Sequence, residues 1–568
     1  MTNKILGIWD GHDSGAALIE GDKILYAVNE ERLTRRKLEI AFPTKSIKIC
    51  LDQTGTSYQD ISNISLSTWD FAKTLTRVFP SLKEQYYLIR RRKAAAGRFA
   101  SFKKKAKYKL TEFPPTLLSH WVSRRMISRR LKKLGFNGFN LYIEDHHFCH
   151  AATAAFCSPF EQALVLTLDG LGDALSGSIY QFCDGVLDQV SAIPARHSFG
   201  IFFEHVTNLM NMRELEDEGK VMALANYAFP IDDNENPMME LIEVNDLTFR
   251  CRFSALKMFD ELHKILWRYP SEQFAFMAQR TLEVKTLELV KNAVKATGLT
   301  NLCLAGGIFS NVKLNRIIRI QSGIKKCFVF PHMGDGGLAI GAAMASNYRL
   351  NAIHRYSVAN IFWGPEYADN DIETALHTSG LSYSKCADIA KDVAEKLANG
   401  KIIFWFQGRM EYGPRALGAR SILARPDSEA IKDELNVRLK RRVWYQPFCP
   451  AMLESDANDI LEDYDGNPEK FMTMAYKVKK EKRALVRGVI NVDGSCRPQI
   501  VEKNDSIFFR LIEEIKGLTG HGILLNTSFN LHGEPLVCSP EDAIKTMADT
   551  GCDFLAIGNF LVMRQNGI

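Results

Sequence analysis

The sequence lacks any long apolar run. No stretch of its 568 residues approaches the roughly 18 apolar residues that a membrane-spanning helix needs. The N-terminal segment MTNKILGIWDGHDSG passes from a strand directly into polar residues, without the apolar stretch and small-residue cleavage site of a signal peptide. We therefore expect no membrane span and a cytoplasmic location.

Paired cysteines, internal repeats and low-complexity linkers are also missing. The 12 cysteines are scattered, form no C-x-x-C pair and sit mostly in apolar runs, as Cys303 and Cys327 do. This pattern predicts buried reduced thiols rather than disulfides or a zinc site. A hydrophobic fraction of 46% and a charged fraction of 24% are typical of a soluble globular protein. The length predicts two to four domains.

Acidic residues are scarce in one segment. Residues 83–133 contain 17 Lys or Arg but only Glu84 and Glu112, a local balance of +15 in a chain whose net charge is +6. Aromatic residues lie between the basic ones, a pattern that can bind nucleic acid or an anionic substrate. No nucleic-acid module surrounds the segment, so we favour a solvated helical insertion.

Two similar β-meanders are predicted in the first half of the chain. Apolar segments 5–9 and 16–19 flank a polar turn, and a third strand follows at 24–28. The pattern recurs where the apolar run 163–168 ends at Asp169 and returns as a second strand at 176–180. Sugar kinases, actin and the Hsp70 ATPase begin with such a meander. The repeat predicts a duplicated, ribonuclease-H-like α/β fold.

Two glycine-rich segments follow the meanders. The segment LCLAGGIFSNVKLN predicts a buried strand that ends at Gly306 and Gly307 before a helix, and we expect both glycines and Asn311 to bind cofactor. The segment FVFPHMGDGGLAIGAAMA predicts a strand that ends at Pro331 and a small-residue helix that Asp335 opens. The pattern then changes, so we place a domain boundary near residue 355, with domains 1–355 and 356–568.

Two histidines predict a metal site in the first domain. Asp145 is the expected N-cap of a helix, and His146 and His150 project from one face of that helix at i and i+4. Imidazole suits Zn, Fe, Ni or Cu, and added carboxylates favour Fe(II) or Mn(II). Asp169 and Asp335, at strand ends that border the predicted cleft, are the expected carboxylate ligands.

Arginines predict an anion site in the second domain. Four of them lie in FWFQGRMEYGPRALGARSILARP, where Gly and Pro interruptions indicate loops. Arginines on loops suit phosphate and carboxyl recognition. Polar residues follow at the end of the predicted strand GILL, where α/β folds place ligand contacts. The candidate residues of this site are Arg409, Arg415, Arg420, Arg425, Lys440, Arg441, Arg442, Arg497, Asn526, Ser528 and Asn530.

These motifs together resemble the O-carbamoyltransferase family that includes the tobramycin, cephamycin and nodulation-factor enzymes. The likeness rests on GHDSGAAL, DHHFCHAATAAF, LTLDGLGD, EGKVMALA, LAGGIFSN, GDGGLAIGAA, QGRMEYGPRALGARSILA, VDGSCRPQIV and NTSFNLHGEP. It implies an N-terminal domain similar to the tRNA threonylcarbamoyl-transferase fold and a C-terminal YrdC-like domain. It also implies that the second domain makes carbamoyl adenylate from carbamoyl phosphate and ATP with Mg, and that the first, holding Fe(II), transfers the carbamoyl group to an acceptor hydroxyl.

The resemblance also assigns roles to residues. His146, His150, Asp169 and Asp335 would hold the metal, which is Fe(II) with Mn or Zn as alternatives. Arg415, Lys440, Arg497 and Ser528 would hold carbamoyl phosphate and the ATP phosphates. His12 and Asp13 would lie near the transferred group, and one of them would serve as the general base. The acceptor would be a small molecule or glycan with a free hydroxyl.

Three positions depart from the family pattern. Val443 and Gln446 stand where a Glu and an Arg are expected, and Asn491 replaces a usual His. Two other functions stay open at this point. One is carbamoylation of tRNA or of a protein, and the other is a non-catalytic nucleic-acid-binding relative.

Overall fold

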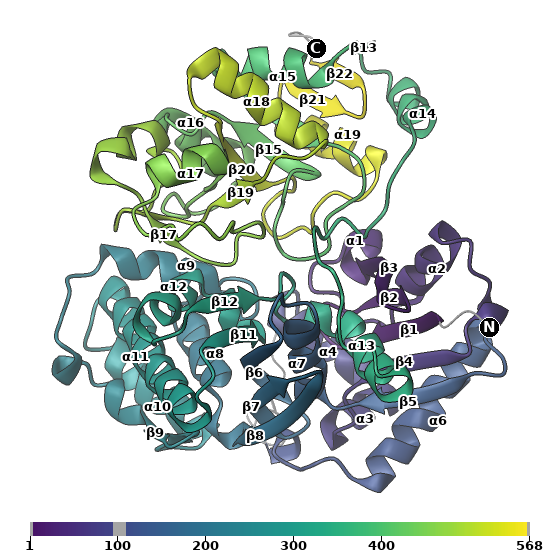
Figure 1. Ribbon diagram of the computed structural model, residues 1–568, viewed down its shortest axis with the longest axis vertical. Coiled ribbons are helices and arrows are strands. Elements are labelled where there is room, and N and C mark those ends of the chain that lie inside the picture. The colour runs from purple at the N-terminus through teal and green to yellow at the C-terminus, as the bar shows by residue number, and fades with distance from the viewer. Residues whose placement is uncertain (1–3, 95–108, 565–568) are drawn as a thin grey trace. The chain divides into compact units, whose positions relative to one another are not determined.

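The chain folds into two compact units (Figure 1). The computed structural model describes residues 4–94 and 109–564. The first unit comprises Met1–Glu30 and Leu38–Ala359, and the second comprises Glu31–Lys37 and Asn360–Ile568. The short segment Glu31–Lys37, most of which is helix α1 (Glu30–Thr34), thus groups with the second unit although first-unit residues flank it in the chain.

The first unit contains two sheets of the same design. Their orders are β3-β2-β1-β4-β5 and β8-β7-β6-β11-β12, and in each an antiparallel meander is followed by two parallel strands. This confirms the predicted duplicated α/β fold. The strands are β1 (Lys4–Trp9), β2 (Gly15–Glu20), β3 (Lys23–Asn29), β4 (Asn63–Ser67), β5 (Asn140–Glu144), β6 (Gln162–Gly172), β7 (Leu175–Cys183), β8 (Val186–Pro194), β11 (Asn301–Ala305) and β12 (Lys326–Val329).

Two buried helices pack closely in the first unit. They are α7 (His146–Phe156) and α13 (Leu338–Asn351), both rich in alanine. A Cβ placed on Gly341 would lie 2.4 Å from the carbonyl oxygen of Cys149, and one on Gly7 would lie 1.9 Å from that of Ala339. Glycine at these positions therefore lets α13 approach both α7 and strand β1.

The described residues of the first unit form further helices. They are α2 (Thr44–Gln53), α3 (Phe71–Val78), α4 (Pro80–Arg90), α6 (Leu117–Leu134), α8 (Phe199–Leu209), α9 (Glu218–Leu224), α10 (Ala255–Leu266), α11 (Ser271–Thr297) and α12 (Val312–Gln321). A small sheet of β9 (Ile242–Asn245) and β10 (Thr248–Cys251) lies beside them. Across the described residues, no helix has the length and apolarity to cross a membrane.

The basic segment 83–133 is only partly a solvated insertion. It includes most of α4 and all of α6 except Leu134, and its residues 95–108 lie outside the described part of the chain. Arg124 and Arg125 on α6 are exposed, as expected. Arg90, however, pairs with Glu204 and Glu214, and Arg91 pairs with Glu216. The solvated interpretation is wrong for these arginines, because acidic residues far along the chain fold back onto α4.

The second unit is built on a mixed sheet of eight strands in the order β13-β22-β21-β14-β15-β20-β16-β19. These strands are β13 (Tyr383–Lys385), β14 (Ile403–Phe406), β15 (Arg420–Ala424), β16 (Cys449–Leu453), β19 (Gln499–Val501), β20 (Ile523–Ser528), β21 (Phe554–Ile557) and β22 (Phe560–Met563). The helices are α14 (Asp369–Ser379), α15 (Ile389–Ala398), α16 (Glu429–Asp433), α17 (Glu454–Ile460), α18 (Ile507–Thr519) and α19 (Pro540–Thr550).

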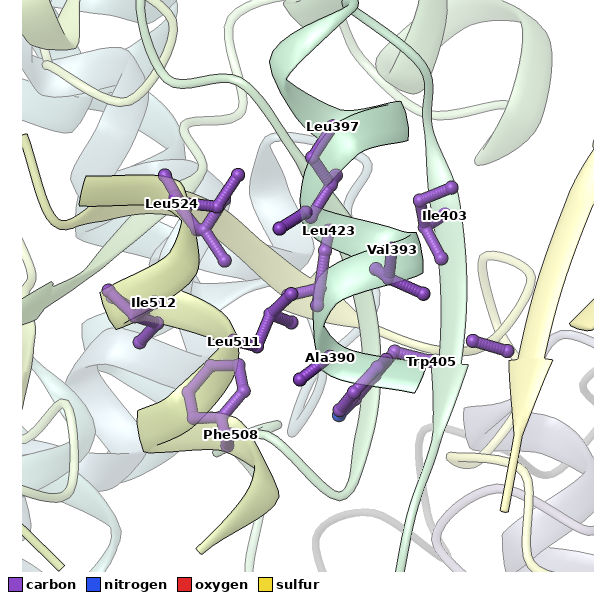
Figure 2. Close-up of a cluster of buried hydrophobic side chains, with 14 of the residues drawn as sticks. Ala390, Val393, Leu397, Ile403, Trp405, Leu423, Phe508, Leu511, Ile512 and Leu524 are labelled. Carbon is purple, nitrogen blue, oxygen red and sulfur yellow. The ribbon is translucent and has the colours of Figure 1, made fainter. Parts of the chain in front are cut away.

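Helices α15 and α18 pack on one face of this sheet. Figure 2 shows Val393 and Leu397 of α15, Leu511 and Ile512 of α18 and Trp405 of β14 in one cluster of buried side chains. Alternate residues of a strand point to opposite faces of the sheet. All residues of β14 are apolar and buried, so both faces of this strand are covered. Residues 467–501 contain the short strand pair β17 (Tyr476–Lys477) and β18 (Ser495–Cys496), a 3-10 helix at Lys480–Val486 and the strand β19.

Candidate functional site

Two histidines and two aspartates meet at one point of the first unit. One ligand atom from each of His146, His150, Asp169 and Asp335 lies within 4.8 Å of the others. Asp169 Oδ2 is 3.4 Å from Nε2 of His146 and 3.1 Å from Nε2 of His150. Asp335 Oδ1 lies 3.6 Å and 3.5 Å from the same two nitrogens. The four residues that sequence reasoning selected as metal ligands are therefore neighbours in space.

Local structure explains the place of the histidines. The Asp145 side chain accepts a hydrogen bond from Phe148 N at 2.8 Å, which caps α7 as expected and starts the helix at His146. The His146 ring lies against Gly172, where a Cβ would be 2.2 Å from ring atoms. Thr68 Oγ1 is 3.0 Å from Nδ1 of His146 and so leaves Nε2 facing the aspartates.

Asp169 is oriented by backbone amides. Its Oδ1 accepts from Gly170 N at 2.7 Å and from Gly307 N at 3.3 Å, while Oδ2 faces the histidines. Strand β6 does not end at Asp169 as predicted but continues to Gly172, with an irregular register between Leu168 and Gly172. The carboxylate therefore projects from an irregular part of the strand.

The electrostatics suit a cation. Burial lowers the pKa of His146 to about 3, which keeps its imidazole neutral. Burial also disfavours the charged form of His150, but the neighbouring carboxylates of Asp169 and Asp335 outweigh it and raise its pKa. Asp335 Oδ1 is buried without a hydrogen-bond partner among the described residues. Two imidazoles, two carboxylates and an oxygen left without a hydrogen bond fit Fe(II), Mn(II) or Zn(II).

His12 and Asp13 lie in the β1–β2 turn beside this cluster. His12 Nε2 is 3.1 Å from Asp335 Oδ2, and its Nδ1 is 3.7 Å from Asp13 Oδ2. The Asn29 amide donates to the carbonyls of Asp13 and Gly336, at 2.9 and 3.2 Å, and ties the turn to the loop that carries Asp335. The structure thus brings both residues to the candidate metal ligands.

Sequence reasoning missed a buried ionic group next to this turn. Asp10, at the end of β1, accepts from Arg77 at 3.0 and 2.9 Å and pairs with Lys73 at 3.1 Å. Lys83 Nζ donates to the Asp10 carbonyl. Asp10 lies in the same polar turn as His12, but no sequence signal joins it to helices α3 and α4.

The glycine segment contributes backbone contacts to the cluster. Gly306 has a φ of 102°, and a Cβ there would lie 2.1 Å from the carbonyl oxygen of Leu168. The backbone amide of Gly307 holds Asp169, as described above. Asn311 caps α12 through Leu314 N at 3.1 Å and exchanges hydrogen bonds with Gln279. The Asn311 side chain is therefore engaged in helix capping.

Lys440 and the end of β20 form the centre of the second candidate site. The Lys440 ammonium donates to Ser528 Oγ at 2.9 Å and to Asn530 Oδ1 at 3.0 Å. A π-helical turn, Glu434–Leu439, precedes Lys440. The backbone amide of Lys440 donates to the carbonyl of Leu435 at the end of this turn. Burial and the nearby Arg442 hold the pKa of Lys440 well below its usual range.

Three arginines add positive charge to this site. Burial and repulsion by Arg497 lower the pKa of Arg415 and of Arg442 to about 9, and Cys449 partly opposes this shift. Arg497 donates to Cys449 Sγ at 3.1 and 3.0 Å. We call Arg415, Lys440, Arg442 and Arg497 the cation cluster. Cations that depress one another's pKa values in this way favour an anionic ligand.

Other predicted residues of the second unit contact backbone or amide groups. Arg420 is fully buried and donates to the carbonyls of residues 365, 407, 408 and 419. Arg409 donates to the carbonyls of Trp363 and Gly364. The Asn526 amide donates to the Ala416 carbonyl and to Gln499. These contacts support the loop that carries Arg415 and do not bring the three residues into the cation cluster.

Glu411 organises this loop and was not selected from the sequence. It is 2% exposed, and its Oε1 accepts from the backbone amides of Leu417, Ala419 and Arg420 at 2.8, 3.3 and 3.2 Å. Of the three departures from the family pattern, Asn491 closes a turn by donating to the Ser495 carbonyl at 2.7 Å. The Gln446 carbonyl accepts from the Asn436 amide at 3.1 Å.

Comparison with known proteins shows the family to which this chain is similar. The family described as Carbamoyltransferase N-terminus matches residues 4–344, and the one described as Carbamoyltransferase C-terminus matches residues 394–564. Nodulation protein NolNO of Sinorhizobium fredii is 32% identical over 98% of this chain and 79% of its own length. The uncharacterized protein MJ1051 of Methanocaldococcus jannaschii is 31% identical over 99% of both chains.

A chain that matches both of these family models is a carbamoyl-group transferase, so the protein is an enzyme. The chain belongs to the carbamoyltransferase family, and the resemblance seen in its motifs is confirmed.

Proposed function

We propose that the protein is an ATP-dependent O-carbamoyltransferase that acts through carbamoyl adenylate. The carbamoyl group would come from carbamoyl phosphate and pass to a hydroxyl of a small molecule or glycan. One observation carries the proposal: a single chain of this family holds a His/Asp cluster in one unit and a buried cation cluster in the other.

The cation cluster suits the formation of the adenylate. Water cleaves carbamoyl phosphate to carbamate and phosphate. A carbamate oxygen then attacks the α-phosphorus of ATP with Mg, and pyrophosphate leaves. Arg415, Lys440 and Arg497 offer donors for the phosphates, while Ser528 and Asn530 orient the lysine.

The first unit suits transfer to the acceptor. The acceptor hydroxyl attacks the carbamoyl carbon, its proton passes to His12 or Asp13, and AMP leaves. His146, His150, Asp169 and Asp335 would hold the metal, for which we propose Fe(II), and such an ion acts as a Lewis acid when bound. The amide of Gly307 keeps the Asp169 carboxylate in place.

ATP–pyrophosphate exchange tests the proposal. We expect exchange that requires carbamoyl phosphate and falls at least about 100-fold in Arg415→Ala, because a donor to charge in the transition state is removed. Arg510→Ala is the matched control, since this arginine forms an exposed ion pair with Asp388 on the surface of the same unit. Absence of exchange in the metal-replete wild type would refute the adenylate route, and equal exchange in Arg415→Ala would remove that residue from it.

A further inference from the structure

The ionic group around Asp10 contains more basic than acidic side chains. Arg77 binds the Asp10 carboxylate through two nitrogens, and Lys73 Nζ is 3.1 Å from Oδ1. Lys83 Nζ reaches the backbone carbonyl of Asp10 and, within the part of the chain that the structure describes, pairs with no carboxylate. Three basic side chains thus meet one carboxylate, which leaves an excess of positive charge.

This excess is poorly solvated. The side chains of Arg77, Asp10 and Lys73 are 1%, 3% and 11% exposed. Burial lowers the pKa of Lys83 to about 7, and repulsion by Lys73 and Arg77 adds to the effect. Uncompensated charge in such a place is costly, and an added anion would relieve the repulsion.

The group borders the candidate metal centre. Lys73 Nζ lies 4.0 Å above the Trp9 ring, and that ring contacts His146 edge-on with centroids 5.8 Å apart. Asp335 is close enough to act electrostatically on Lys73. His12, two residues beyond Asp10, is 34% exposed in its side chain, so this side of the centre is open to a ligand.

We propose that Lys73 and Lys83 form an anion subsite beside the metal centre, which binds a phosphate or carboxylate group of the substrate. Arg77 is committed to Asp10 and to the carbonyls of Ser67 and Thr68, so it holds the subsite together. The two lysines have fewer fixed contacts and supply the donors. The inference rests on the proposed function, because it specifies the substrate of that site.

Two parts of the reaction can supply such an anion. One is an acceptor that carries a phosphate or carboxylate next to its hydroxyl, and the other is the phosphate of the adenylate. In both cases the lysines would set KM for the anionic reactant more than kcat, because they lie beside the reacting atoms and make no bond to them.

Calorimetric binding to the full-length, metal-loaded chain tests the subsite. The probes are AMP, glucose 1-phosphate and inorganic phosphate, with adenosine and glucose as neutral counterparts. An Arg415→Ala background weakens the cation cluster of the second unit. We expect Lys83→Gln and Lys73→Gln to weaken binding of at least one anion about tenfold, which is the worth of one charged hydrogen bond. Lys133→Gln, an exposed lysine on α6, is the matched control.

The outcomes separate the sources. Loss confined to glucose 1-phosphate assigns the subsite to the acceptor, loss confined to AMP assigns it to the adenylate, and a general loss that includes inorganic phosphate supports the subsite for either. A wild type that binds no anion, or lysine variants that bind all three like Lys133→Gln, would overturn the inference. Carbamoyl-phosphate-dependent exchange, measured on the same lysine substitutions in the otherwise wild-type chain, keeps the two proposals apart. If the lysine variants keep this exchange and bind anions as before, only the subsite is rejected. If the wild type shows no exchange, the proposed function is rejected.

Discussion

At the scale of single residues, the two carboxylate oxygens of Asp169 have different contacts. Oδ1 is held by the amides of Gly170 and Gly307, while Oδ2 faces both histidines. Thr68 plays a similar part for His146 by contacting Nδ1. Partners of this kind orient metal ligands before the ion arrives, and their loss typically weakens metal affinity 10- to 100-fold.

Substitution of these residues should therefore change metal binding in a graded way. We expect Thr68→Val to weaken Fe(II) or Zn(II) affinity about 10- to 100-fold and Asp335→Asn to weaken it more, since the latter removes a ligand charge. Thr374→Val, on the exposed face of α14, is the control. Competition with a chromophoric chelator measures the affinity. Equal affinity in Asp335→Asn and the wild type would contradict the proposed ligand set.

Glu218 makes stability depend on pH. Burial raises the pKa of this carboxyl to about 8, assisted by repulsion from Glu204, although the amide of Leu215 donates to it. An unfolded Glu titrates near about 4.3, so between these values the folded chain binds more protons and loses stability as pH rises. The penalty is complete above about pH 8.

We expect Glu218→Gln to remove this penalty, because an amide stays neutral. The Tm of the wild type should fall relative to that of the variant as pH rises from 5 to 9. Scanning calorimetry in matched buffers measures both values, with the exposed Glu373→Gln as the control. A constant difference in Tm across this range would show that Glu218 is ionised throughout.

At the scale of elements, the contact between α7 and α13 sets the place of both segments that carry the candidate metal ligands. Helix α7 carries the histidines, and the turn before α13 carries Asp335. The two helices approach each other closely at Gly341, where an added Cβ would lie only 2.4 Å from the Cys149 carbonyl oxygen. A backbone atom cannot move aside as a flexible side chain can.

Gly341→Ala should therefore destabilise the first unit by about 1–3 kcal/mol, the usual cost of overpacking. Gly219→Ala in α9 meets no atom within 4 Å and should instead be neutral or stabilise by up to about 1 kcal/mol. Urea unfolding followed through the tryptophans measures both changes. Similar stabilities for the two variants would mean that α13 can shift without cost.

At the scale of the whole molecule, the two candidate sites belong to different units. The cation cluster lies in the second unit and the His/Asp cluster in the first. If the proposed function holds, the two half-reactions should separate by mutation. Carbamoyl transfer needs both sites, whereas adenylate formation needs only the cation cluster.

Lys440→Met should lower carbamoyl-phosphate-dependent ATP–pyrophosphate exchange at least about 100-fold, and transfer with it. Asp335→Asn should abolish transfer but keep exchange within about twofold of the wild type. Exchange is followed with labelled pyrophosphate, and transfer by mass spectrometry of acceptor products. Loss of exchange in a folded Asp335→Asn protein would place both half-reactions on the His/Asp cluster.

Local sequence determined a large part of the first unit. Capping by Asp145 and the i, i+4 spacing put His146 and His150 on one face of α7, and the repeated meander indicated the duplicated sheets. These features depend on neighbours within a few residues, so they can be read from the chain. The separation of Asp169 and Asp335 by 166 positions mattered little, because Asp169 comes directly after an apolar strand run and Asp335 opens a predicted small-residue helix.

Tertiary structure alone decided which charges meet. Arginines of one motif went to different places: Arg415 joined the cation cluster, while Arg409 and Arg420 bind backbone carbonyls. Helices α3 and α4 carry three basic residues to Asp10, although these residues lie more than 60 positions away in the sequence. The segment Glu31–Lys37 grouped with the second unit. Charge interactions of this kind depend on distance and burial in the folded chain, and neither follows from position in the sequence.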